Sequence, residues 1–297
     1  MELHEMKSFS TSMWTFLGVA YGLSVGLSAL VGLTGGHQSN LVGLGVLAMG
    51  FPALAVLVVK WVHGDTIAEV GWRRFPIRWL PVALLGLPLC VHAVSLPVVG
   101  VLADGALPWV SWLTPSADGL FHTPAARGWG VLSQSGLVGR FLLNAGLGLL
   151  MVSALSVFEE IGWRAWLLPR LTDRMGERGG VLGGALIWAL WHTPYVLGGL
   201  HYFEHISLYA VLLLTPLGHI GAGIFLGWLW LRTRSIWMVS LAHGALNNWG
   251  QYVFKFMDGP PEFDIWLLTC VSLSLLAVGA FILFRGLSTC SRPHDCA

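Results

Sequence analysis

Long apolar runs recur along the whole chain, and they constrain its fold more than any other feature of the sequence. A helix needs about 20 predominantly apolar residues to cross the hydrocarbon core of a bilayer. Eight segments are candidates by this criterion: 14–35, 41–61, 79–102, 137–168, 179–200, 206–231, 235–255 and 264–285. The sequence therefore predicts an all-α, polytopic membrane protein with about eight transmembrane helices, forming a single integral-membrane domain over residues 1–297.

The composition agrees with a membrane protein and argues against two other classes. Of the 297 residues, 55% are hydrophobic and 10% are charged, whereas soluble globular proteins carry about 25% charged residues. The formal net charge of +1 provides no basic surface for nucleic acid. Four cysteines in a chain of this length do not make a disulfide framework. The lipid bilayer is thus a predicted partner, and nucleic acid is not.

The distribution of basic residues predicts the orientation in the membrane. With eight crossings, both termini fall on one side, and that side receives 12 of the 16 Lys and Arg residues, against three on the other. Cytoplasmic loops of membrane proteins are enriched in Lys and Arg. The N-terminal run lacks a basic n-region and an A-x-A-like cleavage site, so we interpret it as an uncleaved membrane helix. We expect a multi-pass protein of the cell (inner) membrane with both termini cytoplasmic.

Three charges interrupt this apolar pattern in the stretch "SVFEEIGWR", at Glu159, Glu160 and Arg164. Each such charge costs about 2.5–3.5 kcal/mol to insert at a helix centre, so it needs a structural or functional reason. Glu160 and Arg164 are four residues apart and share a helix face. Glu159 lies about 100° around the helix from Glu160. The spacing predicts that Arg164 holds one carboxylate while Glu159 faces a different space. The alternative is a salt-bridged surface turn at the helix end.

Two later helices carry further polar groups. His192 lies within "GGALIWALWHTPYVLGGL", and His243 and Asn247 are four residues apart in "SIWMVSLAHGALNNWGQYVF", with Asn248 beside them. A lone histidine in an apolar helix is more often a core residue. Two histidines, a carboxylate and an amide on three helices instead form a general acid–base set with oxyanion donors.

Three polar residues in the apolar runs are left over from this set. We expect them to pack or to form hydrogen bonds between helices. The role of His219 is the least certain, because it precedes the helix leading into the His243 segment. The three residues are His92, His219 and Asn144.

Three short motifs resemble those of a known family. "EEIGWR" (159–164), "WALWHTP" (188–194) and "HGALNN" (243–248) are similar, in this order, to the motifs of the CPBP superfamily of intramembrane proteases. This superfamily includes the type II CaaX prenyl endopeptidases and the Abi bacteriocin-processing or immunity proteins. The resemblance covers a motif-bearing core over residues 148–250. The first 140 residues match only as generic membrane helices.

The resemblance implies an intramembrane endopeptidase whose helices enclose a catalytic cavity. Its substrate would be a membrane-associated or lipidated protein or a leader peptide. By position, Glu159 would activate the hydrolytic water with His192 as its partner, and His243 and Asn247 would stabilise the oxyanion. The expected supporting residues are Glu160, Arg164 and Asn248.

The sequence also leaves alternatives open. We expect no metal or other cofactor, because no H-E-x-x-H pair is present. In the alternative, Glu159, His192 and His243 hold Zn²⁺ with water as the fourth ligand. Intramembrane Glu and His residues also occur in proton-coupled transporters, although the paired repeats typical of transporters are not visible. A non-catalytic bacteriocin-immunity protein is the third alternative.

Overall fold

The computed structural model describes residues 2–65, 70–102, 114–123, 129–199, 206–250 and 262–287. Helices form nearly all of its regular structure, which confirms the all-α prediction. The α-helices are α1 (Glu2–Leu33), α2 (Phe51–His63), α3 (Leu80–Leu102), α4 (Gln134–Leu143), α5 (Leu149–Glu160), α6 (Leu168–Trp191), α7 (Thr193–Leu197), α8 (Leu208–Thr233), α9 (Ile236–Ala245) and α11 (Glu262–Phe281). The described strands, β1 (Phe121–His122) and β2 (Val131–Leu132), form one short antiparallel pair.

Shorter helical segments of other types connect or extend these α-helices. The 3₁₀ segments are η1 (Gly36–Gln38), η2 (Val42–Gly50) and η3 (Ile77–Trp79). The π-helical segments are η5 (Asn144–Gly148), η6 (Ile161–Leu167), η7 (Leu246–Gly250) and η8 (Ile282–Gly286). Single-turn π segments are rare and often occur at functional sites. Two of them, η6 and η7, contain the second part of the acidic motif and of the histidine motif, respectively.

Six helical segments within the described residues are long and apolar enough to cross a bilayer, as expected of a multi-pass membrane protein. They are Ser10–Leu33, Val42–His63, Ile77–Ser95, Gln134–Leu197, Leu208–Thr233 and Asp264–Gly286. The predicted count of eight is not confirmed. The expected span 137–168 and most of the expected span 179–200 fall inside the single segment Gln134–Leu197. A third, 235–255, continues into residues outside the described part of the chain.

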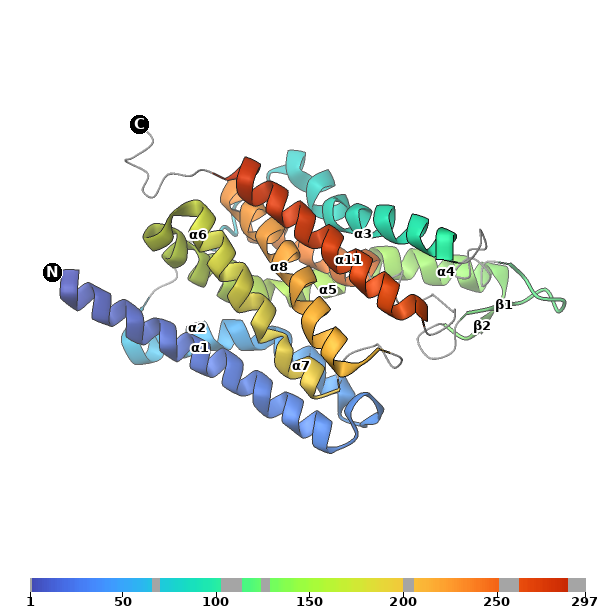
Figure 1. The fold of residues 1–297 in the computed structure, drawn as a ribbon, viewed down its shortest axis with the longest axis horizontal. Helices are drawn as coiled ribbons and strands as arrows, with labels where there is room; N and C mark the ends of the chain where they lie inside the picture. The colour runs from blue at the N-terminus through green and yellow to red at the C-terminus, as the bar shows by residue number, and fades with distance from the viewer. Residues whose placement is uncertain are drawn as a thin grey trace.

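The 64-residue segment Gln134–Leu197 is not straight. Gly176 has φ 70° and ψ 173°, a conformation that glycine reaches without the penalty of a Cβ atom. A Cβ atom on Gly180 would overlap the backbone of Thr172, so the chain doubles back tightly on itself here. Figure 1 shows α6 returning beside the helix that precedes it. This reversal brings the histidine that follows α6 back toward the end of α5.

The C-terminal helices form one side of the bundle. Figure 1 shows α11 lying along α8, with α3 beside them. The α8–α11 contact is close because both helices use glycine: a Cβ on Gly221 would overlap the Leu275 backbone, and one on Gly279 would overlap Gly221. Small residues allow membrane helices to approach in this way. The short α9 is almost completely buried.

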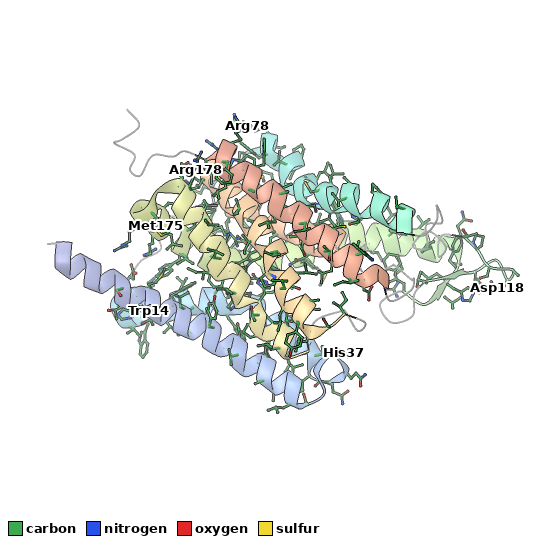
Figure 2. The ribbon with its side chains drawn as sticks, viewed as in Figure 1. Trp14, His37, Arg78, Asp118, Met175 and Arg178 are labelled. Carbon is green, nitrogen blue, oxygen red and sulfur yellow. The ribbon has the colours of Figure 1, made fainter. Side chains whose placement is uncertain are left out.

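The beginning of α1 and the end of α11 lie toward the same end of the bundle (Figure 1). Figure 2 places Arg78 and Arg178 at that end, and Asp118 at the opposite end. Arg178 contributes to the packing there, because its guanidinium donates hydrogen bonds to the carbonyls of Phe284 and Leu287 at the end of the C-terminal helix. The placement concerns the described ends of α1 and α11. The common cytoplasmic side for both termini stays a prediction.

Candidate active site

The acidic motif lies at the junction of α5 and η6, in the buried interior. Glu160 is fully buried, at 0% exposure, and Arg164 and Glu159 are each 3% exposed. The Arg164 guanidinium donates a hydrogen bond of 3.0 Å to Oε1 of Glu160. The predicted pairing of Glu160 with Arg164 is therefore confirmed, and the alternative of an exposed salt-bridged turn is wrong.

A second group reaches the same carboxylate oxygen. Nδ1 of His243, on α9, lies 2.7 Å from Oε1 of Glu160, and the imidazole is 2% exposed. The approach of α9 to α5 depends on Gly244, because a Cβ there would overlap Ser153 of α5. The sequence did not predict this contact. It joins the acidic motif to the histidine motif directly.

Glu159 has a different environment from Glu160. Its Oε2 accepts a hydrogen bond of 3.2 Å from Nε1 of Trp188. Oε2 of Glu160 is buried and lacks a hydrogen-bond partner. Oε1 of Glu159 does not belong to this group of buried, unpartnered atoms. Because Oε1 of Glu159 has no hydrogen bond within the described residues either, this atom reaches accessible space. The two neighbouring carboxylates thus face different surroundings, as the helical spacing predicted.

His192 occupies the joint between α6 and α7. Pro194 follows within the first turn of α7, and its missing N–H removes a hydrogen bond that would continue the helix through the joint. Nδ1 of His192 lies 2.8 Å from the Trp188 carbonyl. A carbonyl only accepts, so Nδ1 carries the proton in this bond. In the neutral ring, Nε2 is then left as an acceptor or a metal ligand.

Trp188 is the common neighbour of the polar groups in this region. Its ring centroid lies 4.8 Å from that of His192, 5.4 Å from that of His243 and 5.4 Å from that of His219. The Arg164 guanidinium carbon lies 4.8 Å from the Trp188 ring centroid. The indole therefore contacts all three histidine rings and fixes Glu159 through its N–H. Trp188 belongs to the motif "WALWHTP", in which only His192 had a predicted role.

The three leftover polar residues have different outcomes. His92 joins α3 to η7, because its Nε2 lies 2.9 Å from the Trp249 carbonyl, as expected of a hydrogen bond between helices. The Asn144 carbonyl accepts a bond of 2.8 Å from the Asn248 amide. His219 instead lies beside His192, with 4.1 Å between the two ring centroids. The structure thus adds His219 to the candidate site.

Asn247 and Asn248 belong to the π segment η7. Their positions differ from the simple α-helical pattern, because a π segment follows His243 and changes the angular spacing. Asn248 is buried and bonded to Asn144, in keeping with a supporting role. Asn247 is partly exposed and has no hydrogen bond within the described residues. Its role in stabilising the oxyanion stays a prediction.

No group of three His, Cys, Asp or Glu side chains among the described residues has an arrangement that would hold a metal ion. The alternative ligand set of Glu159, His192 and His243 is therefore not assembled as a metal site in this conformation. One nitrogen of His243 is already bonded to Glu160. The expectation of metal-free catalysis stays a prediction.

Comparison with known protein families supplies an independent finding. Residues 141–249 match the family model described as type II CAAX prenyl endopeptidase Rce1-like. This part of the chain, the Rce1-like segment, is similar to that family. The match confirms the resemblance seen in the three motifs. A comparison with curated proteins finds no match.

The Rce1-like segment contains every candidate site residue, from Glu159 to Asn248, and also Trp188 and His219. It nearly coincides with the predicted motif-bearing core over residues 148–250. At family level, the match supports a CAAX-type intramembrane endopeptidase in a multi-pass membrane protein. The single integral-membrane domain over residues 1–297 stays a prediction.

Proposed function

We propose that the protein is an intramembrane endopeptidase in which Glu159 activates a water molecule to hydrolyse a peptide bond. The observation that carries this proposal is the difference between the two carboxylates. Glu160 is sealed and bonded to Arg164 and His243, whereas Oε1 of Glu159 reaches accessible space. A general base must contact the group whose proton it removes. Glu159 meets this condition and Glu160 does not.

In this mechanism, Glu159 takes a proton from water as the water oxygen bonds to the scissile carbonyl carbon. The proton then passes to the leaving nitrogen as the carbon–nitrogen bond breaks. His192 is the predicted partner, because its Nδ1–H is held by the Trp188 carbonyl and its Nε2 is an acceptor. Trp188 donates to the other oxygen of Glu159 and keeps the carboxylate oriented.

The oxyanion of the tetrahedral intermediate needs hydrogen-bond donors. We propose His243 and Asn247 for this role. His243 donates through Nδ1 to Glu160, so in its protonated form it offers Nε2–H on the other side of the ring. The charges balance in this form: two carboxylates, Glu159 and Glu160, face one guanidinium and one imidazolium. Such balance matters because an unpaired buried charge is costly.

The serine residues near the site do not support an acyl-enzyme mechanism. The hydroxyl of Ser156 donates to the Val152 carbonyl one helical turn earlier. The hydroxyl oxygen of Ser153 is buried without a hydrogen-bond partner beneath Gly244. A serine nucleophile requires an adjacent base to activate it. Neither serine has one, which favours attack by water.

We propose hydrolysis without a metal ion, because the ring of His243 is committed to Glu160 on one side and is needed as a donor on the other. If zinc were present, Glu159, His192 and His243 would be its ligands, and it would polarise the carbonyl and the bound water. The proposed residues of the site are the same in both cases.

The proposed substrate is a membrane-associated protein or peptide, because the site lies within helices that are long and apolar enough to cross a bilayer. The family description points first to lipidated peptides that end in a CAAX sequence. The test uses the full chain in proteoliposomes with a farnesylated CAAX peptide and, separately, the same peptide without the lipid. Cleavage of either peptide, identified by mass spectrometry, supports an endopeptidase, and preference for the farnesylated form supports lipid recognition. Proton-coupled uptake of a solute, without cleavage of any membrane-associated peptide in a broader panel, would contradict the proposal.

A further inference from the structure

His219 lies in α8, on the turn that follows Pro216. Its Nδ1 lies 2.8 Å from the carbonyl of Thr215, four residues earlier on the same helix. His192 makes the equivalent bond of 2.8 Å with the carbonyl of Trp188, also four residues earlier. Both rings therefore carry their proton on Nδ1 in these bonds. In the neutral form, each leaves Nε2 as an acceptor.

The two rings lie against each other. Their centroids are 4.1 Å apart, and their planes are inclined by 37°. Both rings also contact Trp188, whose indole N–H bonds to Glu159. Three acceptors, from Glu159, His192 and His219, are consequently arranged around one indole ring.

Both Nε2 atoms reach accessible space. His192 and His219 are each partly buried, and neither Nε2 is among the buried atoms that lack a partner in the described part of the chain. Close packing against His192 would be served equally well by an apolar ring. Buried polar atoms in proteins are nearly always hydrogen-bonded. The Nε2 acceptor of His219, next to the proposed catalytic histidine, is therefore expected to bind a ligand with an N–H or O–H group.

We propose that His219 is a further catalytic residue that, together with His192, holds the hydrolytic water. This inference rests on the proposed function. The water donates one hydrogen bond to Oε1 of Glu159 and the other to the paired Nε2 acceptors of His192 and His219. Its lone pair then points away from all three groups, toward the scissile carbonyl. Glu159 removes the proton, and His219 stays neutral throughout, contributing an acceptor and no proton.

Three substitutions separate the nitrogen of His219 from its ring. His219→Phe keeps a ring against His192 but removes both nitrogens. His219→Gln carries an amide oxygen about as far from the backbone as Nε2, whereas His219→Asn reaches only about as far as Nδ1. The two amides differ by one methylene, so each serves as the control for the other. The unfolding temperature of each variant in detergent identifies any loss of folding, and rates are expressed per folded protein.

We expect His219→Phe and His219→Asn to lower kcat about tenfold, the effect of one lost hydrogen bond, with KM unchanged. His219→Gln should retain most of the activity. Wild-type activity in His219→Phe, or equal losses in the Gln and Asn variants, would overturn the inference.

Two reference proteins keep this test separate from the proposed function. The wild-type protein must cleave the membrane-bound peptide, and Glu159→Gln must not. If both conditions hold and the His219→Phe variant matches the wild-type protein, only the role of His219 is wrong. If the wild-type protein cleaves no membrane-bound peptide, or Glu159→Gln cleaves normally, the proposed function fails and the role of His219 fails with it.

Discussion

Glu160 and His243 meet across two helices, with 2.7 Å between Oε1 of the carboxylate and Nδ1 of the imidazole. Arg164 bonds to the same oxygen from the adjoining turn. One buried carboxylate thereby ties the acidic motif to the histidine motif. The interaction leaves Nε2 of His243 and Oε1 of Glu159 for chemistry, and it makes Glu160 a structural element of the site.

Loss of Glu160 should therefore weaken the fold as well as the activity. Glu160→Ala leaves Arg164 as a buried charge without its partner, and removing one member of a buried pair costs about 3–5 kcal/mol. Thermal unfolding in detergent should show a clear decrease in stability, together with loss of peptide cleavage. Asp173→Ala, which removes an exposed carboxylate from α6, is the control and should leave both unchanged. Equal stability of the two variants would contradict this role of Glu160.

The close approach of α9 and α5 predicts a second effect on stability. Gly244→Ala would place a methyl group against Ser153, and overpacking of this kind costs about 1–3 kcal/mol. The displaced helix would also move His243 away from Glu160, so activity should decrease. Gly26→Ala in α1 is the matched control, because its Cβ would meet no atom within 4 Å. Unfolding temperatures and cleavage rates of the two variants give the comparison. A stable and active Gly244→Ala protein would show that this contact does not position the site.

The membrane orientation can be measured directly. Of the 16 Lys and Arg residues, 12 fall on the predicted side of the termini, so we expect both ends in the cytoplasm. A reporter fused after Ala297 should register a cytoplasmic location, and one inserted at Asp118, at the opposite end of the bundle (Figure 2), should not. The reverse pattern would show that the orientation is wrong.

The role of a metal ion is also open to measurement. We predict that exhaustive chelation leaves the rate of cleavage unchanged and that active protein contains no stoichiometric zinc. Elemental analysis and activity assays on the same preparation provide the data. Stoichiometric zinc, with activity lost on its removal and restored on its return, would establish the alternative in which Glu159, His192 and His243 bind the metal.

The sequence predicted those parts of the site that depend on local spacing. Glu160 and Arg164 are four residues apart, and the helical geometry alone indicated both their pairing and the separate direction of Glu159. The bond between His243 and Glu160 joins residues 83 positions apart, so it depends on helix packing that no local pattern contains. The contact of His219 with His192 likewise depends on how α8 packs against α6 and α7. His192 and His219 each bond to the carbonyl four residues earlier. Every residue within a helix has a carbonyl at this spacing, so the spacing did not single out these two histidines.

The apolar runs predicted the membrane class but not the individual helices. Hydropathy does not register Gly176, where one long segment reverses direction. Nor does it distinguish π-helical turns from α-helical ones, although η6 and η7 contain Arg164, Asn247 and Asn248 and alter the directions of their side chains. Backbone details of this kind depend on packing between helices and not on the average polarity of a segment.

The activity of Glu159→Gln tests the central claim most directly. The glutamine keeps the size of the side chain and can still accept the hydrogen bond from Trp188, so the protein should insert, purify and unfold like the wild type. Because general base catalysis contributes about 10²–10⁴-fold to rate, cleavage of a membrane-bound peptide in proteoliposomes should decrease by at least about 100-fold. A Glu159→Gln protein that cleaves the peptide at the wild-type rate would contradict the assignment of Glu159 as the residue that activates water.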